Sequence, residues 1–201
     1  MKIIVVAAFK QEAQYFLNKD KPEKTLSFPF PVYDAGRYSI VISGPGKTNA
    51  ASAVTCMLAG AGQCHVINAG SAGALKADIR EGSTFAVNKI FEADRHLLSG
   101  EKRFLFTENI TSLPSAVCLC RDIPVITAAE RDFFSSDADI ADMESAAVFQ
   151  ICRLFKAGCS IIKTVSDSSS CSDKSEIINK ISAVSVKLYE TVSGLMERIE
   201  N

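Results

Sequence analysis

Apolar runs alternate with helical periodicity along most of the chain. Short runs rich in β-branched residues predict buried strands over residues 2–8, 64–70 and 159–167. Helices are predicted where apolar residues recur at helical spacing, over residues 10–19, 49–62, 142–158 and 175–200. Two further runs, 31–36 and 38–43, read as a hairpin through Gly36, and other strands are expected over residues 82–93, 102–107, 116–120 and 124–128.

The alternation of strand and helix predicts the fold class. It favours an α/β protein, a three-layer α/β/α sandwich with a mixed, mainly parallel central sheet. No linker or repeat interrupts the pattern, and the one low-complexity tract, residues 166–173, reads as a loop. We therefore expect a single domain spanning residues 1–201.

Composition narrows the classes of function. Hydrophobic residues make up 47% of the chain and the formal net charge is −1, so no basic surface for nucleic acid is expected. The first apolar run is too short to span a bilayer, and Lys10 and Glu12 follow it too soon for a signal peptide. We expect a cytoplasmic protein without a membrane segment.

Cysteine and histidine do not form a recognisable framework. The seven cysteines are an odd number without CxxC spacing, and the two histidines, His65 and His96, stand far apart. We therefore expect reduced thiols, no structural disulfide, no metal and no cofactor. A catalytic cysteine–histidine pair stays open as an alternative.

Residues 43–50, SGPGKTNA, end like a phosphate-binding loop. The full G-x-x-x-x-G-K-[ST] pattern requires a glycine five residues before Gly46, where this chain has Val41. Without that glycine the backbone would not wrap phosphates easily, so a P-loop nucleoside triphosphatase is disfavoured. That alternative would predict binding of a nucleoside triphosphate with Mg²⁺.

Polar or glycine-rich features follow several predicted strands. These are Glu12, the turn Gly44-Pro45-Gly46, the segment Gly70–Gly73 with Ser71, the pair Met143-Glu144, and the pair Ser166-Asp167. Ligands of open α/β sheets bind beyond the carboxyl ends of the strands, so these features are expected to meet in one crevice. Each alone has a simpler explanation, as a solvated side chain, a helix-dipole partner or a cap.

The segments GPGKTNAA, INAGSAGAL, DMESAAV and TVSD, in that order, resemble the nucleoside phosphorylase/nucleosidase superfamily. Within it the chain is most similar to the 5'-methylthioadenosine/S-adenosylhomocysteine nucleosidase branch. The resemblance covers most of the chain and thins between Phe91 and Ala141. In that family the G-x-G-K segment joins a strand to a helix, and its lysine does not bind phosphate.

The resemblance implies hydrolysis of the N-glycosidic bond of a purine nucleoside, with assigned roles. Asp167 would be the general acid toward the purine, and Glu12 would orient and deprotonate water. Glu144, with the Met143 backbone, would bind the ribose hydroxyls. Ser71 would lie near the water and Ser166 would help to place the base.

Other positions follow from the resemblance with alternatives attached. Phe9 would lie near the sugar, while Phe133 or Phe134 would stack on the base; ordinary core packing is the competing reading for each. Ile177 or Ile178 would line the side of the 5' substituent. Superfamily members complete their pockets with a neighbouring subunit, so a homodimer is expected.

Three alternatives to this function remain open at this point. Phosphorolysis needs cationic donors for phosphate, yet the arginine that phosphorylases carry three residues before the serine is Asn68 here, and no arginine precedes Arg37. Lys10 or Arg37 could substitute. The substrate could also be another nucleoside, such as futalosine, adenosine or inosine, and a non-catalytic nucleoside-binding module is the alternative of a different class.

Overall fold

The computed structural model describes residues 1–95, 98–167 and 180–200. In chain order the elements are β1 (Lys2–Ala7), α1 (Gln14–Asp20), β2 (Glu23–Leu26), β3 (Val32–Asp34), β4 (Tyr38–Ile42), α2 (Lys47–Leu58), β5 (Cys64–Ala74), β6 (Thr84–Glu92), β7 (Phe104–Phe106), β8 (Ser115–Cys120), α3 (Ala128–Ser135), β9 (Ile140–Asp142), α4 (Ser145–Phe155), β10 (Gly158–Asp167), the short 3-10 helix η1 (Ser182–Val184) and α6 (Ser185–Glu200).

The strands form one mixed sheet, which confirms the predicted fold class. Its order is β10-β6-β8-β9-β5-β1-β4-β3-β2, with β7 paired to β6. The central pairs β1–β4, β1–β5 and β5–β10 are parallel, whereas β2, β3 and β7 at the edges pair antiparallel. Because β10 also pairs with β5, the strands β5, β9, β8, β6 and β10 close into a ring.

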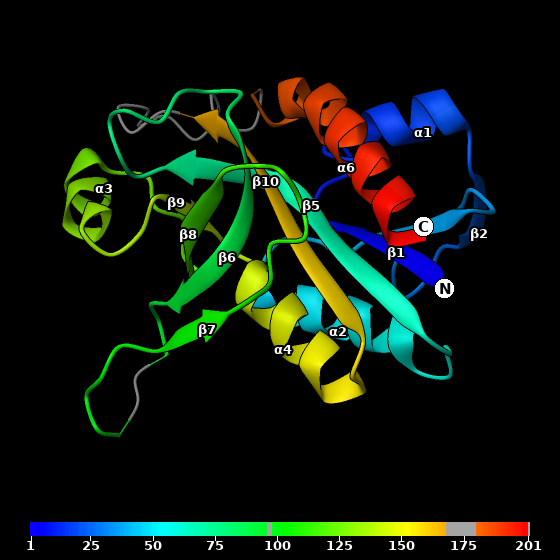
Figure 1. Cartoon of the computed structure of the whole chain (residues 1–201), viewed down its shortest axis with the longest axis horizontal. Coiled ribbons are helices and arrows are strands. Elements are labelled where there is room, and N and C mark those ends of the chain that lie inside the picture. Colours follow the sequence, from blue (N-terminus) through cyan, green and yellow to red (C-terminus); the bar gives the residue numbers. More distant parts are fainter. Residues whose placement is uncertain (96–97, 168–179, 201) are drawn as a thin grey trace.

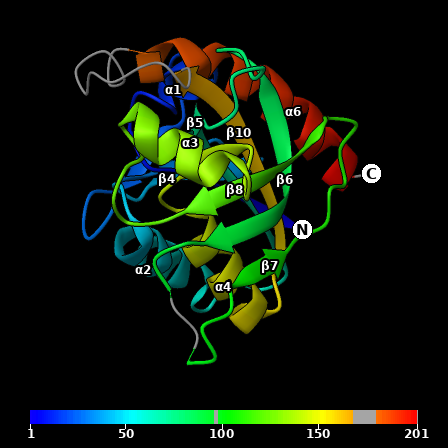
Figure 2. The ribbon, with the colours of Figure 1, turned by 90° about the vertical axis from the view of Figure 1, so that its left-hand side faces the viewer.

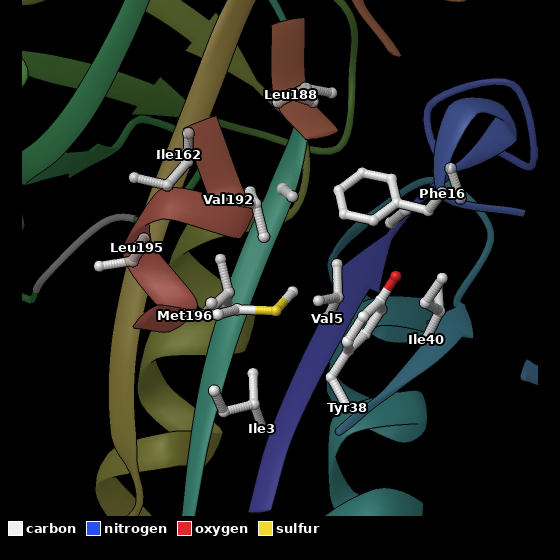
Figure 3. Packing of buried hydrophobic residues seen from close by; sticks show 14 of the residues in the cluster. Ile3, Val5, Phe16, Tyr38, Ile40, Ile162, Leu188, Val192, Leu195 and Met196 are labelled. Carbon is white, nitrogen blue, oxygen red and sulfur yellow. The ribbon is translucent and has the colours of Figure 1, made fainter. Parts of the chain in front are cut away.

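Helices cover both faces of the central strands, with α1 and α6 on one side and α2 and α4 on the other (Figure 1). Alternate residues of β1 point to the two layers. Ile3 and Val5 join the core under α6, and Ile4 and Val6 join the core over α2 and α4. Figure 3 shows Val192 and Met196 of α6 lying over β1 and β5. Helix α3 lies outside these layers, beside β8 (Figure 2).

Two predicted boundaries differ from the structure near the ends of β1 and β5. The first helix starts at Gln14 and not at residue 10, because the Glu12 carboxylate binds the backbone N–H groups of Ala8 and Phe9 and turns the chain there. Strand β5 continues to Ala74, beyond the end predicted at residue 70, so the segment Gly70–Gly73 is part of the strand.

The strand predicted over residues 124–128 is absent, because this segment is a loop that leads into α3. Pro124 has no N–H group to offer a sheet. Thr127 is the N-cap of α3 and forms a capping box with Glu130, which commits the end of the segment to the helix start. In addition, α4 starts at Ser145, and Asp142 belongs to β9.

Two observations concern the wider expectations. Among the helices of the described residues, none has the length and apolar character that a bilayer crossing requires. The cysteines within the described residues are all free thiols, while Cys171 lies outside them, as do Ile177 and Ile178.

The packing of α6 on the sheet generates a stability prediction. Leu188 is fully buried between α6 and the central strands. Leu188→Ala should lower the free energy of unfolding by about 2–5 kcal/mol, because it removes apolar contacts and leaves a cavity. Leu154→Ala is the matched control, since Leu154 is 76% exposed; its effect should stay within about 0.5 kcal/mol. Urea denaturation measures both, and equal losses would refute this account of the core.

Candidate active site

A cavity of about 330 Å³ opens at the carboxyl ends of β1, β5, β9 and β10. Its wall combines carboxylates, hydroxyls and apolar side chains. The lining residues are Phe9, Glu12, Pro45, Ser71, Ala72, Gly73, Pro124, Val125, Ile126, Ala141, Asp142, Met143, Glu144, Ser166, Asp167 and Ile181. The convergence expected from the strand ends is therefore present in the structure, since Glu12 and Asp167, which are 155 residues apart in the chain, line one cavity.

Glu12 is held rigidly at one end of this cavity. Its side chain is buried, and Oε2 accepts hydrogen bonds from the backbone N–H groups of Ala8 at 2.9 Å and Phe9 at 3.0 Å. Oε1 accepts from both the backbone N–H and the hydroxyl of Ser71, each at 2.7 Å. These four donors fix the direction of the carboxylate, which a group that orients a small molecule requires.

The glycine turn between β4 and α2 approaches the cavity from another side. Gly44 and Gly46 have φ values of 80° and 93°, which favour glycine, and the N–H of Gly46 donates to Glu144 Oε1 at 2.9 Å. The amine of Lys47 points away, to Asp94 at 2.5 Å and Glu92 at 3.4 Å. A lysine engaged by two acids is not placed to bind phosphate, which argues against the P-loop alternative.

A buried lysine that the sequence analysis did not single out lies beneath the cavity. Lys163 of β10 is 1% exposed, and its Nζ lies 2.8 Å from Asp142 Oδ2 and 3.9 Å from Glu144 Oε2. Asp142 also accepts from the backbone N–H and hydroxyl of Ser145, at 2.9 Å and 2.7 Å. A buried ammonium is tolerated only with such partners.

Lys163 lies closer to Asp142 than to Glu144, so the pKa values of these two carboxyl groups differ. Burial pushes the pKa of Asp142 upward, but Lys163 and the Ser145 hydrogen bonds outweigh burial and leave that pKa below its usual value. Burial raises the pKa of Glu144 to about 7, and the more distant Lys163 offsets only part of this effect. Burial lowers the pKa of Lys163, but its carboxylate neighbours outweigh burial and raise it overall. Glu144 is therefore the member of this group that changes charge near neutral pH.

Asp167 ends β10 at the other side of the cavity and has two partners. Ser166 donates its hydroxyl to Oδ1 at 2.8 Å, and Arg131 of α3 donates to Oδ2 at 2.5 Å. A Cβ atom on Gly73 would lie 3.1 Å from Oδ2 and 3.2 Å from Arg131 Nη1, so glycine leaves room for this close approach.

The candidate residues from the sequence divide into two groups. Glu12, Ser71, Met143, Glu144, Ser166, Asp167 and Phe9 line the cavity. Phe133 does not, because its ring is 72% exposed on α3 and packs edge-on against Phe134. The apolar loop residues Pro124–Ile126 line the cavity instead. They were not expected there because the sequence analysis predicted them to form a strand.

Arg131, Lys163 and Asp142 were also missed. Lys163 stands in an otherwise apolar strand, so its position in IIKTV was an available indication of a buried charge. Arg131 has charged neighbours on an amphipathic helix, and no local pattern distinguishes it from a solvated arginine. Within the described residues no cluster of His, Cys, Asp and Glu is arranged to hold a metal ion.

Comparisons with known proteins agree with this geometry. The chain matches the phosphorylase superfamily over residues 2–118 and 115–199. It is 26% identical over 200 residues to the 5'-methylthioadenosine/S-adenosylhomocysteine nucleosidase of Maridesulfovibrio salexigens, covering 83% of this chain and 86% of that one. The 5'-methylthioadenosine/S-adenosylhomocysteine nucleosidase of Bacillus subtilis is also 26% identical, over 202 residues that cover 83% of this chain and 86% of that one.

Solved structures of the same kind share the fold. The 5'-methylthioadenosine/S-adenosylhomocysteine nucleosidase of Helicobacter pylori superposes with a TM-score of 0.85 at 18% identity, covering 98% of each chain. Futalosine hydrolase of Helicobacter pylori superposes with a TM-score of 0.82 at 19% identity, covering 96% of this chain and 97% of that one.

The raised pKa of Glu144 predicts a pH-dependent stability. An unfolded glutamate titrates near about pH 4.3, whereas Glu144 in the folded protein titrates at about 7. Between these values the folded state binds the extra proton, so this group's contribution to stability is full below the lower value and is lost as pH rises through the window. The expected loss is on the order of 3 kcal/mol.

Urea unfolding between about pH 4 and pH 8 tests this prediction. Glu144→Gln cannot titrate, so its stability relative to the wild type should rise across the window. Glu23→Gln, a change on an exposed strand, is the matched control and should follow the wild type. Parallel curves for all three proteins would mean that Glu144 is ionised throughout.

Proposed function

The chain belongs to the phosphorylase superfamily, and we propose that it hydrolyses the N-glycosidic bond of a purine nucleoside, with 5'-methylthioadenosine and S-adenosylhomocysteine the first substrates to test. A cavity of about 330 Å³ suits a ligand of this size. Relatives named for this activity match most of the chain, and four carboxylates line the cavity. We propose that residues 1–201 form a single domain.

Two carboxylates divide the chemistry in this proposal. Breaking the bond leaves an oxocarbenium-like ribose and an electron-rich base. Asp167 gives a proton to a nitrogen of the departing base, and Glu12 takes a proton from the water that attacks the sugar carbon. The firm hold on Glu12 by Ser71 and by the Ala8 and Phe9 backbone suits a base that must aim at one water.

The remaining lining residues would bind the substrate. Glu144 accepts from the ribose hydroxyls, with Met143 beside it, and the Gly46 N–H keeps the carboxylate in place. Ser71 completes the water site, Ser166 orients Asp167 toward the base, and Phe9 lies against the sugar. Pro124–Ile126 and Ile181 offer an apolar wall that fits a thioether substituent.

Hydrolysis is favoured over phosphorolysis by one observation above all. The cavity wall carries Glu12, Asp142, Glu144 and Asp167, and no lysine or arginine stands among its described lining residues. A phosphate dianion needs cationic donors, and it would be repelled by these acids. Neither Lys10 nor Arg37 lines the cavity, so neither replaces the arginines of phosphorylases.

Futalosine hydrolysis is a second candidate, because the chain superposes almost as well on a futalosine hydrolase. A panel of 5'-methylthioadenosine, S-adenosylhomocysteine, futalosine, adenosine and inosine separates the two candidate activities.

We also propose a homodimer in the cytoplasm. Ile123 and Phe133 are 66% and 72% exposed on the loop and helix beside the cavity wall, and covering such side chains favours association. Sedimentation velocity measures the subunit number, and a monomer at micromolar concentration would refute this part of the proposal.

Base release by purified protein tests the proposed reaction. Wild-type enzyme should release free base from at least one nucleoside of the panel at a rate independent of phosphate. Asp167→Asn should lower the rate by roughly 10²- to 10⁴-fold, the usual contribution of a general acid. Asp78→Asn, the same change at an exposed position, should leave the rate unaltered.

Product analysis identifies the opposing results. A rate proportional to phosphate, with ribose 1-phosphate as product, would establish phosphorolysis. Tight nucleoside binding without turnover of any panel member would instead establish a binding module.

A further inference from the structure

Arg131 is a buried cation beside the proposed acid. It is 1% exposed, and among the described residues it is the only lysine or arginine within 4.0 Å of the Asp167 carboxylate. Its Nη2 lies 2.5 Å from Asp167 Oδ2, and its Nη1 donates to the Ala74 carbonyl oxygen at 2.7 Å. The capping box of Thr127 and Glu130 fixes the start of α3 at Ala128, three residues before Arg131. The helix start and the Ala74 carbonyl oxygen therefore hold the Arg131 guanidinium against Asp167.

Stability alone does not account for this ion pair. Apolar residues of similar volume commonly replace a buried pair without loss of stability, because taking two charges out of water is costly. Here the cost is increased further, since Arg131 Nε is buried without a hydrogen-bond partner. A role for the pair in the chemistry of Asp167 gives a reason for its presence.

Arg131 acts on Asp167 and not on the substrate. The guanidinium does not line the cavity that Asp167 lines; it faces a second cavity of about 440 Å³ between the end of β5 and α3. The other charged groups of the first cavity, Glu12, Asp142 and Glu144, with Lys163 beneath them, make no ion pair with Asp167. Strand β5 offers only Gly73 at this point, and residues 124–126 are uncharged.

We propose that Arg131 is a positioning residue that makes Asp167 a stronger proton donor to the leaving base; this rests on the function proposed above. As the glycosidic bond breaks, its electron pair goes to the base and the Asp167 proton moves to a base nitrogen. The carboxylate that remains is held by the Arg131 guanidinium and the Ser166 hydroxyl. Stabilising that product of proton transfer lowers the barrier.

Arg131→Met and Arg131→Gln remove the charge and test the proposal. The kcat for base release should fall by roughly three- to thirtyfold, a part of the 10²- to 10⁴-fold that a general acid usually contributes. KM should change little, since Arg131 does not line the substrate cavity. Gln keeps a donor for the Ala74 carbonyl, so it serves if the Met variant does not fold.

Two control variants separate charge from packing. Arg131→Lys keeps the cation and should retain more of the wild-type kcat than Met or Gln. Arg80→Met makes the same change at an exposed arginine and should match the wild type. Folded Met and Gln variants with the wild-type kcat, or a Lys variant as slow as they are, would overturn the inference, because the charge of Arg131 would then not act on Asp167. Absence of base release by the wild type from every nucleoside would instead overturn the proposed function, and the inference with it.

Discussion

Buried charge is the constraint on which the rest of this structure depends. Four carboxylates line one cavity, and two buried cations, Lys163 and Arg131, compensate three of them. Glu12 has no cation within ion-pair distance among the described residues and relies on backbone and hydroxyl donors. A buried charge without partners would unfold a protein of ordinary stability, so each of these side chains is held in one place. The rigidity that catalysis needs follows from the cost of burying the groups that perform it.

The fold supplies the geometry for this arrangement. The parallel strands β1, β5 and β10 bring their carboxyl ends to one edge, so Ser71 and Asp167 arrive there from different parts of the sequence. The ring formed by β5, β9, β8, β6 and β10 adds Asp142 and the start of α4. Lys163 lies four residues before Asp167 on β10 and pairs with Asp142 and Glu144. One strand therefore carries both Asp167 and the lysine that compensates two other carboxylates of the cavity.

Much of this architecture could be predicted from the sequence, and the failures have physical reasons. The continuous apolar run of β1, which packs on both sides, and the apolar stripe of α6 indicate the layers, and strand ends located Glu12, Ser71, Glu144 and Asp167. Residues 124–128 have the composition of a strand, but Pro124 and the cap at Thr127 make them a loop. Phe133 or Phe134 was expected at the base from the resemblance, yet neither lines the cavity and Phe133 is exposed on α3. The role of Arg131 could not be predicted from local sequence, because its partner Asp167 is 36 residues away.

A crystal structure of the Asp167→Asn variant with 5'-methylthioadenosine is the most direct test of the central claim, that opposite ends of one cavity serve the base and the water. We predict the purine edge within hydrogen-bond distance of residue 167, the ribose hydroxyls on Glu144, and a water between Glu12 and the anomeric carbon. A purine lying against Glu12, or a nucleoside bound outside this cavity, would contradict the account.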